Sequence, residues 1–296
     1  MNEPDADFST KRVQGRSFPA GNFRVVEIDP TKGSELLTEQ LLSKDTDGYP
    51  ICVIRGAVDR EICSTIEANF WRLIAVSAET RPKDEVVAVA QIGAHQFGKS
   101  GHQYLSMAKS TEQLIAELFV GLTEQQVSSA LFEDFMVSGL SRRGISFRAA
   151  RAFGMQSSRC AARSWKVPGK YALLPHEDFS QLLSARADHF EISTIESVTA
   201  YNLCVANPGG SRLHVWNVDP SPSSKTELGL QGVGYPYPLD LLNGYEKLEV
   251  ELGSGDAYFL RSNFVHAVVS TGVDGRITLG RFLGRLADVN TFVYWT

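Results

Sequence analysis

The second half of the chain is a succession of short β-rich runs, and this pattern constrains the fold more than any other feature. From about residue 171 onward, runs of β-branched and aromatic residues alternate with turn sequences such as NPGG, LGSGD and GVDG. Many short strands separated by turns are typical of a β-sandwich or a jelly-roll barrel. The expected strands cover residues 171–174, 197–206, 211–218, 247–252, 257–260, 267–270, 276–284 and 291–295.

The first half of the chain combines two expected strands with helices. In the helical runs, apolar residues recur every three or four positions, so each helix has one apolar face that can pack on a core. A capping-box pattern, Thr123 followed by Gln126, marks the start of the last helix. We expect strands at 23–28 and 49–58 and helices at 59–75, 111–120 and 123–140.

Length and composition allow a single packed domain. The chain has 296 residues, of which 43% are hydrophobic, and this is enough for a sizeable core. We expect residues 1–20 to form a flexible N-terminal arm and residues 21–296 to form one domain. Within this domain, helical support would span about 57–140 and the jelly-roll core mostly 165–296. Residues 219–245, rich in Ser, Pro and Gly, are expected to form a lid-like loop.

Charge and hydropathy argue against several classes of protein. The net charge of −5 does not suit a nucleic-acid binder, whose affinity depends on cationic contacts with phosphates. No run of about 18 apolar residues is present, and the polar start of the chain lacks the apolar core of a signal peptide. We therefore expect a cytoplasmic protein with neither a nucleic-acid nor a membrane partner. The four cysteines form no CxxC pair and are expected to be reduced thiols: Cys52, Cys63, Cys160 and Cys204.

A histidine and a carboxylate stand together at the end of one expected strand, in the sequence LLPHEDFSQL. Residues i and i+2 of a strand face the same side, so His176 and Asp178 should point together and Glu177 should point away. A third ligand is expected from His266, in FLRSNFVHAVVS, on a separate strand. Two histidines and one carboxylate, with three open positions, suit non-haem Fe(II) enzymes that activate O₂. Core histidines and a turn aspartate are the alternative interpretation.

An arginine that could bind a carboxylate follows the second histidine in the sequence. Arg276 lies ten residues after His266, at the start of the strand-like run RITLGRF. A guanidinium can bind a carboxylate through two parallel hydrogen bonds, and Thr278 would add a hydroxyl on the same face. A dicarboxylic co-substrate that chelates a metal at one end needs such an anchor at its other end. Arg281, odd-spaced from both, should face the other way.

The metal-site pattern and the stretches around it resemble those of Fe(II)/2-oxoglutarate-dependent oxygenases. Within these, the chain resembles the carrier-protein-independent aliphatic halogenases of hapalindole and welwitindolinone biosynthesis. The similarity covers most of the chain and implies a mainly β fold with flanking helices around a double-stranded β-helix core of the jelly-roll, cupin-like kind. It is carried by DGYPICVIRGAVDREICSTI, VAVAQIGAHQFGKS, FEDFMVSGL, the segment from 163 through HEDFSQLL, NPGGSRLHVWNVDP, GSGDAYFLRSNFVHAV, RITLGRFLG and VYWT.

One departure from the halogenases decides what the resemblance implies. Those enzymes have a glycine at the carboxylate position of the triad, and chloride takes the vacated place on the iron, whereas this chain has Asp178. The resemblance therefore implies the halogenase scaffold with the chemistry of a hydroxylase. By analogy His176, Asp178 and His266 bind iron. Arg276 and Thr278 are implied as cofactor-binding residues that hold the distal carboxylate of 2-oxoglutarate.

Arg163, thirteen residues before His176, aligns with an arginine of the halogenase pattern. The resemblance implies a contact with 2-oxoglutarate or with an anionic substrate, and a surface or structural role is the alternative. Four further residues are candidates for lining the substrate pocket, with ordinary packing or surface roles as the alternative: His95, Phe97, Trp216 and Tyr235.

The resulting hypothesis is an Fe(II)-, 2-oxoglutarate- and O₂-dependent dioxygenase of specialised or amino-acid metabolism. It would hydroxylate an unactivated C–H of a small carrier-free metabolite, such as an amino-acid derivative, an alkaloid or a nucleoside, and release succinate and CO₂. Desaturation, epimerisation or cyclisation on the same scaffold are alternatives, and halogenation is a weaker one. A non-catalytic jelly-roll binding protein, a cupin-type isomerase and a dioxygenase without 2-oxoglutarate are rivals. The sequence allows a homo-oligomer without indicating one.

Overall fold

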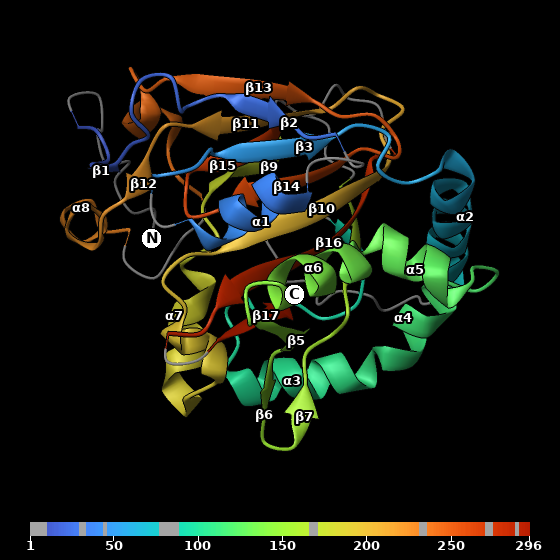
Figure 1. Cartoon of the computed structure of the whole chain (residues 1–296). Helices are drawn as coiled ribbons and strands as arrows, with labels where there is room; N and C mark the ends of the chain where they lie inside the picture. Colours follow the sequence, from blue (N-terminus) through green and yellow to red (C-terminus); the bar gives the residue numbers. More distant parts are fainter. Residues whose placement is uncertain are drawn as a thin grey trace, which may run out of the picture.

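Two β-sheets lie face to face in this computed structural model and form the centre of the molecule, with helices around them (Figure 1). The structure describes residues 11–29, 34–43, 46–76, 89–165, 171–230, 236–269, 275–287 and 290–296. No helix within these ranges has the length and apolar character needed to cross a membrane.

The larger sheet supplies one wall of the central layer. Its strand β8 (Ala161–Trp165) pairs with the first half of β16 and, on its other edge, with β4 (Val89–Ile92). All neighbours are antiparallel except the β2–β3 and β17–β5 pairs. The main path runs β2 (Val25–Glu27), β3 (Ile51–Ile54), β14 (Ala257–Arg261), β10 (Thr199–Ala206), β16 (Ile277–Arg285), β17 (Thr291–Trp295) and β5 (Ser146–Ala149).

The smaller sheet supplies the other wall. Its four antiparallel strands are, in spatial order, β13 (Lys247–Glu251), β11 (Arg212–Trp216), β15 (His266–Val269) and β9 (Tyr171–His176). From β9 to β16 the chain passes repeatedly between the two sheets. Apolar side chains from both inner faces, among them Ala200, Leu213, Val215, Leu260 and Val268, form one buried cluster between them. This arrangement is the double-stranded β-helix expected from the sequence, in a mainly β protein with flanking helices.

Helices cover the outer face of the larger sheet. In α2 (Arg60–Val76), Ile62, Ile66, Phe70 and Leu73 follow helical spacing and are buried in the cluster that the helices form with this sheet. Short strands and helices complete the fold. They are β1 (Gly15–Arg16), α1 (Ser34–Leu42), α3 (Gly101–Ser110), α4 (Glu112–Leu118), α5 (Glu124–Ala130), α6 (Glu133–Ser141), β6 (Arg151–Ala152), β7 (Met155–Gln156), α7 (Gln181–Ala185), β12 (Asp219–Pro220) and α8 (Pro222–Glu227), with 3-10 turns at Arg186–Asp188, Glu191–Thr194 and Leu239–Leu242.

The single helix expected over 123–140 is wrong, because the chain breaks into α5 and α6. Phe132, between them, has a left-handed backbone with φ of 54°. The Tyr201 hydroxyl donates to the Ala130 carbonyl at 2.6 Å, and the Arg281 guanidinium donates to the Leu131 carbonyl. These carbonyls accept hydrogen bonds from side chains of the sheet in place of amides from a further helical turn, so α5 ends there.

The flexible arm expected over residues 1–20 is wrong for its second half, and residues 1–10 lie outside the described ranges. Val13 and Phe18 are buried, and β1 pairs with β12. The Phe18 amide donates to Asn217 Oδ1 at 2.7 Å, which fixes this segment to the end of the smaller sheet. The core also recruits β4, β5 and β8, which precede the expected boundary at residue 165.

The segment 219–245 is more ordered than the lid-like loop expected from its composition. It contains β12, α8 and a 3-10 turn, and it packs on the outer face of the smaller sheet. Tyr237 and Leu241 are buried there against Val265 and Ala267. Residues 231–235 lie outside the described ranges.

Candidate metal centre and co-substrate pocket

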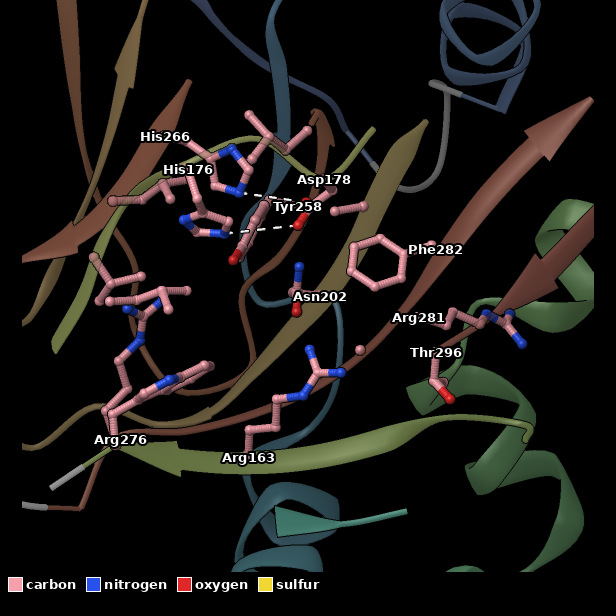
Figure 2. Close-up of a pocket in the computed structure, with 17 residues that line it drawn as sticks. Arg163, His176, Asp178, Asn202, Tyr258, His266, Arg276, Arg281, Phe282 and Thr296 are labelled. Carbon is pink, nitrogen blue, oxygen red and sulfur yellow. Dashed lines mark ion pairs between the residues drawn. The ribbon is translucent and has the colours of Figure 1, made fainter. Parts of the chain in front are cut away.

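The side chains of His176, Asp178 and His266 converge on one point between the two sheets (Figure 2). One potential ligand atom from each residue lies within 4.8 Å of the other two. His176 Nε2 is 3.6 Å from Asp178 Oδ1, and His266 Nε2 is 3.4 Å from Asp178 Oδ2. Two imidazoles and a carboxylate grouped on one side of a point form the donor set that suits Fe(II) with open positions opposite.

The smaller sheet creates this convergence through its register. His176 ends β9, His266 begins β15, and the two are direct partners across the strands. Asp178 follows β9, and its amide donates to the Ser262 carbonyl at 2.8 Å, which turns the carboxylate back toward the histidines. Glu177, between the two ligands, points away and pairs with Lys225 at 2.5 Å. The alternation expected from the sequence is therefore present at this strand end.

Backbone carbonyls orient both imidazoles. Nδ1 of His176 lies 2.8 Å from the Leu174 carbonyl, and Nδ1 of His266 lies 2.9 Å from the Phe264 carbonyl. A carbonyl can only accept, so Nδ1 carries the proton and Nε2 presents its lone pair to the centre. Both histidines are therefore in the tautomer whose Nε2 can bind a metal, and these residues fit a divalent metal.

The protonation states also suit metal binding. Burial, together with the nearby His266, lowers the pKa of His176 to about 4, so this ring is neutral at pH 7. Burial acts to lower the pKa of His266, but the Asp178 carboxylate raises it above its ordinary value. Burial likewise acts to raise the pKa of Asp178, and the two histidines bring it below its ordinary value. Asp178 is therefore an anionic donor in this pocket.

Arg276 lies in the same cavity, at the start of β16 on the facing sheet (Figure 2). The residue is only 3% exposed, and its Nε and Nη1 atoms have no hydrogen-bond partner in the part of the chain that the structure describes. A buried cation without such partners is unfavourable, and a carboxylate entering the cavity would supply them. The arginine therefore fits the far end of a dicarboxylate whose near end reaches the metal.

Thr278 and Arg163 are neighbours on the inner face of the larger sheet. Thr278, two residues after Arg276, is buried and pairs directly with Arg163 of β8. Arg163 lines the cavity, and its Nε donates to Gln91 Oε1 at 3.2 Å. Arg281 is also among the residues that line the cavity, but its guanidinium points away from the two histidines and Asp178 and pairs with Glu133 at 3.1 Å, as its odd spacing predicts.

Three of the four residues expected to contact substrate, His95, Phe97 and Trp216, are not brought to this cavity. Trp216 faces the opposite side of the smaller sheet and packs in the cluster with Tyr237 and Leu241, so its prediction as a pocket residue is wrong. His95 contacts Gln91 and Lys99 and does not line the cavity, and Phe97 is 47% exposed away from it. Tyr235 lies outside the described residues.

Sequence reasoning missed several residues that line the cavity. Asn202 of β10 and Tyr258 of β14 face the metal ligands from the larger sheet, as does Phe282 of β16. Gly280, within the run RITLGRF, offered a signal, because glycine inside a strand often marks a close approach of another group. No local pattern distinguishes Asn202, whose position depends on pairing between distant strands.

Comparison with known proteins identifies the family. No protein-family model matches the chain. The L-isoleucine 3(1)-dioxygenase of Pantoea ananatis (strain AJ13355) is 35% identical to it over 277 residues, which cover 93% of each protein. The chain belongs to the family of this L-isoleucine dioxygenase.

Two enzymes are among the solved structures whose backbones are similar to that of this chain. The epimerase SnoN of nogalamycin biosynthesis has 12% identity and a TM-score of 0.48, with 88% of each chain covered. An N-substituted L-amino acid dioxygenase of Burkholderia ambifaria AMMD has 13% identity and a TM-score of 0.45, with 78% of this chain and 91% of the other covered.

Proposed function

We propose that this dioxygenase hydroxylates an unactivated C–H of a free aliphatic amino acid or a close derivative, with succinate and CO₂ as by-products. His176, Asp178 and His266 would hold the iron, and Arg276 with Thr278 would hold the far carboxylate of 2-oxoglutarate. The observation that carries the proposal is the convergence of three potential ligand atoms in the cavity that also holds a buried arginine, two of whose nitrogens have no hydrogen-bond partner among the described residues. The substrate class rests on the L-isoleucine dioxygenase, which shares 35% of its sequence.

The chain's own residues would position the reactants and exclude water. Bound iron supplies the activation of O₂, coupled to the oxidation of 2-oxoglutarate. Arg276 fixes the far end of the keto acid, so its near end meets the open side of the three ligands. The cavity lies between the two sheets, and apolar side chains such as Leu213, Leu260 and Val268 line part of it, which would limit the access of bulk water to the reacting groups.

Asp178 favours hydroxylation over halogenation on this scaffold. A carboxylate on the metal occupies the position that a halide would need beside 2-oxoglutarate and O₂. Desaturation, epimerisation and cyclisation begin at the same C–H bond, and the placement of the substrate carbon decides among them. The resemblance to the halogenases is therefore one of scaffold in this proposal.

The test is a succinate-release assay with Fe(II), ascorbate and 2-oxoglutarate. The panel contains free aliphatic amino acids, N-acyl amino acids, nucleosides and indole alkaloids, and products are identified by mass spectrometry. We expect hydroxylated product with aliphatic amino acids, and its loss in His176→Ala. His102→Ala, which removes an exposed histidine on α3, is the matched control and should retain activity. Absence of succinate with every compound would refute the proposal.

A further inference from the structure

A second arginine faces the cavity from the larger sheet, on the Asp178 side of the metal ligands. Arg163 extends from β8, and its guanidinium points toward Asn202, which lies just below Asp178 (Figure 2). Arg276 lies on the other side, below His176. The two guanidinium groups therefore approach the metal centre from different directions.

Strand register explains why Arg163 and Asn202 meet. Thr278 of β16 pairs with Arg163 of β8 on one edge and with Cys204 of β10 on the other. One step along the same face, Gly280 pairs with Asn202. A Cβ on Gly280 would stand 2.3 Å from Asn202 Oδ1, so the amide lies across the space that this glycine leaves open. Arg163 extends toward the same space from β8, which pairs with the other edge of β16.

Gln91 holds the arginine in this orientation. Gln91, 4% exposed on β4, accepts from Arg163 Nε at 3.2 Å and donates to the Gly93 carbonyl at 2.9 Å. Its Nε2 also lies 3.2 Å from His95 Nδ1, and His95 Nε2 lies 2.5 Å from Lys99 Nζ. This chain of contacts fixes the plane of the guanidinium before any ligand arrives.

Both arginines present a guanidinium to the same cavity. Arg163 and Arg276 each carry one positive charge, whereas Arg281, which also lines the cavity, is paired with Glu133. The proposed function assigns Arg276 to the far carboxylate of 2-oxoglutarate. The guanidinium of Arg163 is then a second group in the cavity that suits a carboxylate.

Asn202 adds neutral hydrogen-bonding groups at the same place. Within the described part of the chain, no hydrogen bond engages its side-chain amide, which lines the cavity. An amide NH₂ beside a guanidinium can bind the second oxygen of a carboxylate. Phe282, on the same side of the cavity in Figure 2, provides an apolar surface next to these polar groups.

We propose that Arg163 and Asn202 bind the α-carboxylate of the substrate, with Gln91 as the positioning residue. The inference rests on the proposed function and specifies its substrate class: a small molecule with a free carboxylate and an apolar side chain that lies toward Phe282. In this arrangement the far carboxylate of 2-oxoglutarate is held by Arg276 with Thr278 and does not contact Arg163. Conversion of the substrate's carboxylate to an amide would remove this ionic contact.

The test measures binding without turnover. Ni(II)-loaded protein saturated with 2-oxoglutarate is titrated calorimetrically with L-isoleucine and with L-isoleucinamide, which lacks the carboxylate. We expect the acid to bind at least tenfold more tightly than the amide. In Arg163→Gln the Kd of the acid should rise at least tenfold, the Kd of the amide should change little, and the Kd of 2-oxoglutarate should stay within twofold.

Further variants separate the roles of the three residues. Asn202→Ala should reduce the preference for the acid by a smaller factor, of a few fold. Gln91→Leu should reduce it partly, because the guanidinium keeps its charge and loses its orientation. Arg142→Gln, at an exposed arginine at the end of α6, is the matched control and should leave every Kd unchanged. Melting temperatures verify that each variant is folded.

Two results would overturn the inference while leaving the proposed function in place. In one, wild-type protein binds the acid and the amide equally. In the other, Arg163→Gln weakens 2-oxoglutarate and leaves the ratio of acid to amide intact, which makes Arg163 a co-substrate ligand. Should L-isoleucine not bind, the comparison uses the panel compound that releases most succinate. Failure of 2-oxoglutarate to bind the wild-type protein refutes the proposed function itself.

Discussion

At the scale of single residues, one cavity contains the anionic side chain of Asp178 and, from the facing sheet, the guanidinium groups of Arg163 and Arg276. Asp178 is the one acidic side chain among the described residues that line the cavity, and its negative charge lies beside His176 and His266. In the proposed metal centre it would therefore decide both the charge of the site and the number of positions left open on the iron. Changes at this residue test the proposed chemistry most specifically.

Replacing Asp178 with glycine should abolish hydroxylation and weaken metal binding. The change removes one of three ligands and its charge, so we expect hydroxylated product to fall at least a hundredfold. Wild-type protein in high chloride should give no chlorinated product, whereas the position opened by Asp178→Gly can accept the halide. Both are measured by mass spectrometry of the products, and chlorination by the wild-type protein would contradict the role given to Asp178.

Replacing Arg276 with alanine should act mainly on the co-substrate. Truncating one partner of a buried charged pair costs about 2–5 kcal/mol, so the KM for 2-oxoglutarate should rise by about a hundredfold. The KM for the amino-acid substrate should change far less. Steady-state kinetics with each reactant varied in turn separates the two, and an unchanged KM for 2-oxoglutarate would place its carboxylate elsewhere.

At the scale of elements, a buried ion pair connects α8 to the chain just after β9, the strand that ends at His176. Lys225 of α8 lies 2.5 Å from Glu177, whose other oxygen accepts from the Ser180 amide at 2.9 Å. The Tyr237 amide also donates to the Pro175 carbonyl at 2.7 Å. These contacts hold the segment after β12 against the strand that supplies His176. The segment therefore fixes the position of the chain on both sides of His176 from outside the barrel.

Breaking this ion pair should destabilise the protein. Lys225→Met leaves the Glu177 carboxylate buried without its partner, so the free energy of unfolding should fall by about 3–5 kcal/mol. Lys247→Met, at a half-exposed lysine paired with Glu249, is the matched control and should cost less than about 1 kcal/mol. Denaturant unfolding measures both. Adding Glu177→Gln to Lys225→Met should restore part of the loss, and no recovery would contradict the explanation by charge.

A second cluster ties α6 to the larger sheet and should make stability depend on pH. Burial acts to raise the pKa of Glu133, but hydrogen bonding with Arg159 and the charge of Arg281 bring it below its ordinary value. A carboxylate with a lowered pKa stabilises the folded state above its unfolded pKa, and the effect is lost as the pH falls through the folded value. Glu133→Gln should therefore cost about 2 kcal/mol at pH 7.

The same comparison at low pH is the check on this explanation. Below about pH 4 the carboxyl group becomes protonated in the unfolded chain, and the difference between wild type and Glu133→Gln should shrink. Unfolding curves at pH 7, 5 and 3 measure the difference. A constant difference at all three pH values would show that packing at this position matters and charge does not.

At the scale of the whole molecule, local sequence patterns predicted the strands and the convergence of His176 with Asp178, because both depend on short-range alternation. The faces of β11 were not predictable in the same way. The smaller sheet is buried on both sides, so alternation in the sequence does not reveal that Trp216 faces the 219–245 segment and not the cavity. Contacts across long separations were equally hidden, such as Gln91 with Arg163, 72 residues apart.

The central claim is that His176, Asp178 and His266 hold iron and that Arg276 faces the keto acid chelated to it. A crystal structure of the anaerobic Fe(II)–2-oxoglutarate complex, with anomalous scattering measured at the iron edge, tests it most directly. We expect one strong anomalous peak bonded to all three side chains, and a 2-oxoglutarate carboxylate against Arg276. An iron peak elsewhere, or a co-substrate whose far carboxylate lies away from Arg276, would contradict the account.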